Sequence, residues 1–170
     1  MTSRTRQERC IGCGAAVPAE NGPTHRYLES APGCWRLYGE VLAREYENPT
    51  YWRVHQLTVD AYAIQHPGRQ SAQTIQSAAI HLLRLYLQLE QGAEEAEVLA
   101  RTRALAQKKT QLVWITPPES RGSLTVVDVH GAREAEEHAA KVRAWAHEAW
   151  IAWAAHYDPV RRWVTGVFEP

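Results

Sequence analysis

The chain has 170 residues, enough to bury a core without disulfide bonds, and we expect a single domain over residues 1–170. Its 19 Lys and Arg residues balance 19 Asp and Glu residues, so the formal net charge is zero, which argues against a general nucleic-acid-binding protein. No apolar run approaches the roughly 20 residues that span a bilayer, and the N-terminal MTSRTRQERC lacks the apolar core of a signal peptide. We therefore expect a soluble cytoplasmic protein that binds neither nucleic acid nor membrane.

The N-terminal part of the chain contains little that favours regular structure. Residues 1–9 are polar, and we expect a flexible tail there. From Cys10 to Ser30 the sequence is rich in Gly and Pro, which favours neither a helix nor a regular strand. A bound metal ion could order such a segment in place of backbone hydrogen bonds. We therefore predict a metal-binding segment over residues 10–34 and a helical bundle over residues 35–170.

Apolar spacing predicts the first two helices. The first runs from about Pro32 to Tyr46, with Ser30 as its expected N-cap. The second opens with Asn48 as its cap and Pro49 in its first turn, where the missing N–H of proline costs nothing. It continues to about His66, where the sequence HPG ends it.

Further helices are predicted over about 71–90, 93–109 and 133–156. The stretch from Leu112 to Val129 is ambiguous, because its alternating apolar residues favour two paired strands while Thr125 followed by Asp128 resembles the cap that opens a helix. The expected fold is mainly α: an irregular bundle of about five helices with an N-terminal zinc-knuckle segment and at most one short β-hairpin, near Leu112–Val129.

The sequence CIGCG carries the clearest chemical signal. Cys10 and Cys13 form a Cys-x-x-Cys knuckle, in which a tight turn directs two sulfurs at one ion. Gly12 lies between the two cysteines and Gly14 follows them, and glycine favours such a turn. Cys34, at the start of a helix where the dipole favours a thiolate, is the expected third ligand. The alternative is a buried or redox-active cysteine pair without metal, although a thioredoxin-type pair expects a βαβ context that is missing here.

A tetrahedral Zn²⁺ site needs a fourth ligand, and three histidines are candidates. His25 is the first choice, because it lies in the loop between the knuckle and the first helix and needs the least folding to reach the cysteines. His66 and His55 are the alternatives, since both lie within a short stretch of chain after Cys34.

A second group of polar residues lies in VHQLTVDAYAIQHPG. On one helix His55, Tyr62 and His66 fall within about 40° of each other, whereas Asp60 points away from them. The short turn after His66 returns the next helix antiparallel, which places His81 level with His55. These residues are candidate catalytic groups for acid–base or metal chemistry, and we predict that the histidines and Tyr62 meet in one pocket. The alternative is that each is a hydrogen-bonded core residue.

Tryptophans mark the C-terminal part of the chain. Trp145, Trp150, Trp153 and Trp163 form an aromatic stripe with Arg161, and the expected role of such a stripe is core packing in a helical bundle. An exposed part of it would suit a partner surface or a planar or anionic ligand. No Walker motif, nucleophile elbow or Rossmann glycine pattern occurs, which excludes the commonest nucleotide-dependent enzymes and serine hydrolases.

Several of these motifs together resemble an uncharacterised bacterial family, a domain of unknown function. The resemblance extends over the Cys-x-x-Cys knuckle, THRYLESAPGCW, VLAREY, VHQLTVDAYAIQHPG and WIAWAAHYDPVRRW. It implies no activity. It does imply a shared polar set of residues, namely Cys10, Cys13, His25, Cys34, His55, Asp60, Tyr62, His66 and His81.

Two functions fit the sequence. In the first, a structural zinc ion orders the N-terminal segment of a small binding or regulatory module, whose partner is a small molecule or a protein. In the second, the protein is a metal- or histidine-dependent enzyme that performs a hydrolytic or group-transfer step on a small molecule. A site with three cysteines and one histidine favours the first function, because four protein ligands leave no position for water. Whether the protein is an enzyme stays open at this point.

Overall fold

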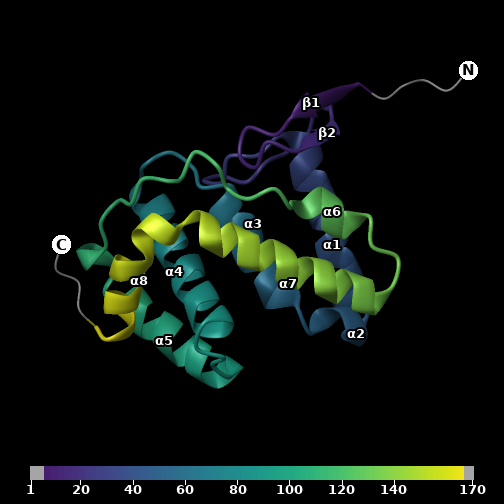
Figure 1. The fold of residues 1–170 in the computed structure, drawn as a ribbon. Coiled ribbons are helices and arrows are strands. Elements are labelled where there is room, and N and C mark those ends of the chain that lie inside the picture. The colour runs from purple at the N-terminus through teal and green to yellow at the C-terminus, as the bar shows by residue number, and fades with distance from the viewer. Residues whose placement is uncertain (1–5, 167–170) are drawn as a thin grey trace, which may run out of the picture.

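The computed structural model describes residues 6–166 of the chain. The fold is mainly α, as predicted, with one short antiparallel hairpin (Figure 1). The strands are β1 (Gln7–Arg9) and β2 (Ala16–Pro18). The α-helices within the described residues are α1 (Pro32–Glu47), α2 (Pro49–Trp52), α3 (His55–Gln65), α4 (Ala72–Leu89), α5 (Glu95–Gln107), α6 (Val126–His130), α7 (Ala135–Ala152) and α8 (Tyr157–Val164), and two 3₁₀ turns are η1 (Lys109–Gln111) and η2 (Ala154–His156).

Helix α3 lies at the centre of the fold and packs against both α4 and α7. Helix α1 packs against α6, while α5 and α8 pack against α4, so that the hairpin and the α4–α5–α8 group occupy different ends of the molecule (Figure 1). Trp145, Trp150 and Trp153 are buried, which confirms the predicted core role of the aromatic stripe. Within residues 6–166 no helix combines the length and the apolar character needed to cross a bilayer.

Side-chain caps start α2 and α4; the cap at Asn48 was predicted, and the cap at Ser71 was not singled out from the sequence. The side chains of Asn48 and Ser71 each accept a hydrogen bond from a backbone N–H in the first turn of α2 and α4, respectively. The predicted cap of α1 is wrong: Ala31 occupies that position and makes no side-chain bond, and Ser30 is buried one residue earlier. Helix α1 therefore starts without a side-chain cap.

The predicted second helix is interrupted. Helix α2 ends at Trp52, and α3 begins at His55 after Val54, whose backbone leaves the helical region and whose side chain is buried. This break makes His55 the first residue of its own helix, directed by a new helix axis rather than by the axis of α2.

The hairpin lies elsewhere than predicted. Strands β1 and β2 pair on either side of the cysteine knuckle, so residues 7–9 of the expected flexible tail belong to a strand, while residues 1–5 lie outside the described part of the chain. The stretch 112–129 contains no strand and ends in α6, which opens with a capping box between Thr125 and Asp128. The cap outweighs the alternating pattern here, because a lone hairpin has little stability of its own.

Candidate metal centre

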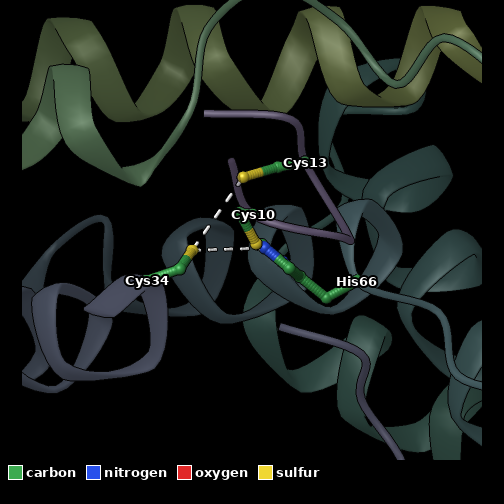
Figure 2. A group of neighbouring side chains, drawn as sticks. All are labelled: Cys10, Cys13, Cys34 and His66. Atoms are coloured by element: carbon green, nitrogen blue, oxygen red, sulfur yellow. Dashed lines mark hydrogen bonds between the residues drawn. The ribbon is translucent and has the colours of Figure 1, made fainter. Parts of the chain in front are cut away.

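Four side chains from three segments converge beside the hairpin (Figure 2). Cys10 and Cys13 lie in the turn between β1 and β2, Cys34 lies in the first turn of α1, and His66 follows the last residue of α3. Their ligand atoms all lie within 4.8 Å of one another. Sγ of Cys13 and Sγ of Cys34 are 3.9 Å apart, and Nε2 of His66 is 3.4 Å from Sγ of Cys34. Tetrahedral Zn²⁺ with Zn–S bonds of about 2.3 Å requires roughly these separations.

The knuckle turn depends on its two glycines. Gly14 has a φ of +76°, in the left-handed region that favours glycine, and its N–H donates to the carbonyl of Cys10. A Cβ atom at Gly12 would lie 2.3 Å from the carbonyl oxygen of Glu29 and 2.3 Å from the ring of His66. The absence of a side chain at Gly12 therefore lets the knuckle approach the other two segments closely.

His66 is held in the orientation that a ligand needs. Its side chain is fully buried, and its Nδ1 lies 2.7 Å from the carbonyl oxygen of Tyr62, to which it donates. The hydrogen on Nδ1 leaves the lone pair of Nε2 directed at the sulfurs. A backbone hydrogen bond from Glu29 to the carbonyl of His66 and an isolated bridge between Leu28 and Pro67 attach this end of α3 to the N-terminal segment.

The sulfurs share their negative charge unequally. The pKa of Cys10 is lowered, because Cys13 and Cys34 direct their thiols at its sulfur. The pKa of Cys13 is raised to about 11, chiefly by its hydrogen bond to Cys10, and that of Cys34 is raised by its bonds to both other cysteines. One thiolate is thus stabilised, while a second and third would repel it in a buried site. A divalent cation removes this repulsion, so the donor set fits a metal ion.

The structure brings the alternative ligand His66, and neither His25 nor His55, to the three cysteines. His25 lies in the loop after the knuckle with its ring against Tyr27 and Trp35, at centroid distances of 4.4 and 5.4 Å. Nearness along the chain favoured His25, but the loop directs its side chain away from the knuckle.

A family model described as "Family of unknown function (DUF5946)" matches residues 8–154. The chain belongs to this family. No curated protein and no solved structure matches the chain. The match confirms the resemblance noted in the sequence, and it assigns no activity, so the function has to be argued from the sites themselves.

The predicted pocket of three histidines and Tyr62 is not formed in this family member. Tyr62 and His66 do lie together, with their rings stacked at 3.9 Å, and the Tyr62 hydroxyl lies 3.6 Å from Sγ of Cys34. His55 and His81 lie elsewhere, and the prediction that they face each other is wrong. Each of them instead hydrogen-bonds to a different buried carboxylate.

The first carboxylate is Glu45, which is fully buried on α1. It accepts hydrogen bonds from Nδ1 of His55 at 2.8 Å, from Nε2 of His138 at 2.8 Å and from the hydroxyl of Thr58. The group connects α1, α3 and α7. Neither Glu45 nor His138 was singled out from the sequence, although Glu45 follows Val41 by four residues on the apolar face of α1, where a carboxylate is unusual.

The second carboxylate is Asp60, fully buried on α3. It lies 2.8 Å from Nδ1 of His81 and 3.3 Å from Nε of Arg84, and it also accepts hydrogen bonds from the side-chain amides of Gln56 and Gln88. This group connects α3 to α4. None of the hydrogen-bond partners of Asp60 is His55, Tyr62 or His66, the three residues from which the helical spacing predicted that it points away.

Proposed function

We propose that the protein is a small, single-domain zinc-binding module of the cytoplasm, in which Cys10, Cys13, Cys34 and His66 hold one structural Zn²⁺. The ion would fix residues 10–34 to the helices, and the ordered protein would bind or regulate a partner that is a small molecule or a protein. The observation that supports this proposal is the gathering of four ligand atoms within 4.8 Å.

The donor set favours zinc among the common metal ions. Three thiolates and one imidazole are the ligands of structural zinc sites, whereas Mg²⁺ and Ca²⁺ prefer oxygen ligands, which the cluster lacks. The knuckle turn between two paired strands also places two sulfurs on one side of the chain, as zinc knuckles require.

Burial of the ligands favours a structural ion over a catalytic one. Cys10, Cys34 and His66 are buried, and only Cys13 is partly exposed. Four protein ligands complete a tetrahedral shell, which leaves no position for the water molecule that a zinc hydrolase activates. The metal therefore supports the binding-module function more strongly than a metal-dependent hydrolytic function.

The alternative function is a histidine-dependent enzyme, and one observation favours it. His55 is oriented by the buried Glu45 and lines a cavity together with Arg84. A carboxylate–histidine pair beside a cationic group is a common arrangement for acid–base catalysis. Hydrolytic or group-transfer activity on a small molecule would be lost in His55→Gln and retained in His25→Gln.

Metal analysis of the purified full-length protein tests the main proposal. Protein from zinc-supplemented medium should contain about one zinc ion per chain, and Co²⁺ substitution should give the absorption of a tetrahedral thiolate site. Cys10→Ser and His66→Ala should lose the metal, while His25→Ala should retain it as the matched control. Protein without any bound transition metal would refute the proposal, and loss of zinc in His25→Ala alone would overturn the assignment of the fourth ligand.

A further inference from the structure

A cavity of ≈ 230 Å³ lies away from the metal ligands, between α2, α3, α4 and α5. Its polar lining includes Arg53, His55, Arg84 and one acid, Glu95, and Trp52 forms an aromatic wall. The volume is below the roughly 300–1,000 Å³ of pockets for drug-sized ligands. The cavity therefore suits a molecule of only a few non-hydrogen atoms.

Arg84 presents a fixed donor group to this cavity. Its Nε lies 3.3 Å from the carboxylate of the fully buried Asp60, which anchors the guanidinium, and the side chain is only 11% exposed. Among the described residues its two terminal nitrogens have no hydrogen-bond partner. A guanidinium fork held in this way matches the two oxygens of a carboxylate or phosphate group without first having to be ordered.

His55 presents a second fixed group. Its Nδ1 lies 2.8 Å from the carboxylate of Glu45, and its ring is stacked on Trp52 at a centroid distance of 4.2 Å and an interplanar angle of 11°. Because a carboxylate only accepts hydrogen bonds, Nδ1 carries the hydrogen, and in the neutral form of the ring Nε2 is an acceptor. Nε2 has no partner among residues 6–166. A hydroxyl or amino group on a ligand could donate to it.

We propose that this cavity binds a small molecule with an oxyanion, either carboxylate or phosphate, and a neighbouring hydroxyl or amino group. The oxyanion lies against Arg84 and Arg53, and the hydroxyl or amino group donates to Nε2 of His55. Arg53 is available for this role, because its ion pair with Glu136 is exposed on the surface and weak. The site specifies the small-molecule partner of the binding module, and in that respect rests on the proposed function.

Glu95 provides a test of whether the cavity prefers a negatively charged ligand. It lies in the cavity wall and is exposed, so its negative charge opposes an anion without supporting the core. Removing that charge strengthens oxyanion binding, while removing the charge of Arg53 weakens it. If Arg84 serves only to neutralise Asp60, the cavity binds no oxyanion and neither substitution changes binding.

NMR titration of the full-length, zinc-loaded protein measures binding. The probes are glycolate, which carries a carboxylate and a hydroxyl, and inorganic phosphate, with sodium chloride at matched ionic strength as the control. One or both oxyanions should shift the indole N–H of Trp52 and the ring of His55 saturably, with a Kd on the order of 1 mM, and the stronger probe identifies the oxyanion. Chloride should give no saturable shift.

Four variants complete the experiment. Arg84→Lys keeps the charge beside Asp60 but loses the fork, and should weaken binding at least about tenfold, while Arg143→Lys on the exposed face of α7 should not change it. Glu95→Gln should tighten binding about two- to fivefold, and Arg53→Gln should weaken it by a similar factor. Because Glu95 and Arg53 are exposed, their variants test the oxyanion site even if Arg84→Lys is unstable.

The proposal is overturned if neither oxyanion gives saturable shifts, or if binding is insensitive to both Glu95→Gln and Arg53→Gln. The zinc content of every variant is measured in parallel. A protein that holds zinc but binds no oxyanion refutes this inference alone, whereas a protein without zinc refutes the function proposed for the metal centre.

Discussion

The N-terminal segment and the central helices of this molecule are ordered in different ways. Outside strand β2, residues 10–31 contain no regular secondary structure, and the candidate metal ligands together with a few backbone bonds lie between them and the helices. Helices α3, α4 and α7 instead bury a large apolar core that includes Trp145, Trp150 and Leu82. If the four candidate ligands hold an ion as proposed, order in the first region depends chiefly on that ion, whereas order in the second depends on apolar burial.

The two regions also treat buried polar groups differently. In the central helices Glu45 and Asp60 each have several donors supplied by neighbouring helices, so both carboxylates are satisfied by the protein alone. In the metal cluster the three sulfurs mainly face one another and the ring of His66. The cluster therefore lacks a positive charge that would offset more than one thiolate, whereas both carboxylates of the helical core have their donors within the protein.

Metal removal should give the largest effect and should affect the two regions unequally. In Cys13→Ser, or after chelation, we expect hydrogen-exchange protection to disappear from residues 7–31 and to persist in α3 and α7. Structural zinc sites contribute on the order of 10 kcal/mol of apparent binding free energy, more than any single side chain. Zinc re-addition to the chelated wild-type protein should restore protection and serves as the control. Equal loss of protection in both regions would show that they are one cooperative unit.

The converse experiment weakens the helical core. Trp145 is fully buried, and its indole N–H donates to the side chain of Gln65. Trp145→Ala should lower the free energy of unfolding by about 3–5 kcal/mol through the cavity it leaves, as measured by urea denaturation. Trp52→Ala, at a residue that is 47% exposed, is the matched control and should cost far less. Similar losses for both variants would contradict the assignment of the core.

The helices were predictable because local signals and burial agree. Apolar spacing and the cap Asn48 predicted the outer ends of the helical regions between residues 32 and 90 to within a few residues, but not the break between α2 and α3. The stretch 112–129 was harder, because its alternating apolar residues suit a strand while the capping box at Thr125 suits a helix. The strands β1 and β2 were missed since three-residue strands leave almost no periodic signal.

The cysteines of the candidate site were predictable, and the histidines were not. The Cys-x-x-Cys spacing acts locally, but the choice between His25 and His66 depends on a tertiary contact, the bridge between Leu28 and Pro67, that no local pattern contains. His81 lies beside Asp60 on α3 rather than level with His55, which lines the cavity with Arg84 and Gln88. The orientation of both histidines is set by buried carboxylates, one of which lies on a different helix.

A smaller effect is expected from the carboxylate group around Glu45. In Glu45→Gln one oxygen becomes an NH₂ group, which faces a hydrogen-bond donor and leaves a buried polar group unsatisfied. We expect a loss of about 1–3 kcal/mol in the free energy of unfolding with no change in zinc content. Glu47→Gln, two residues later on the exposed side of α1, is the matched control. A loss of zinc in Glu45→Gln would show that this group and the metal centre are coupled.

The smallest effect concerns how two helices begin. The hydroxyl of Ser71 accepts a hydrogen bond from the N–H of Thr74 at 3.1 Å and so caps α4, whereas α1 has no side-chain cap and carries the candidate metal ligand Cys34 in its first turn. Ser71→Ala should cost about 1 kcal/mol of unfolding free energy, and Ser71→Gly only a few tenths.

The comparison between the two regions becomes sharpest when Ser71→Ala is measured with and without zinc. If α4 starts independently of the metal, the cost of losing the cap is the same in both states, because independent sites add. Metal removal alone should instead release the start of α1, visible as lost hydrogen-exchange protection around Cys34. If the cost of losing the cap changes when zinc is removed, the ion also stabilises α4, through the segment that joins His66 to Ser71. The part of the protein that depends on the ion would then include α4 as well as the N-terminal segment.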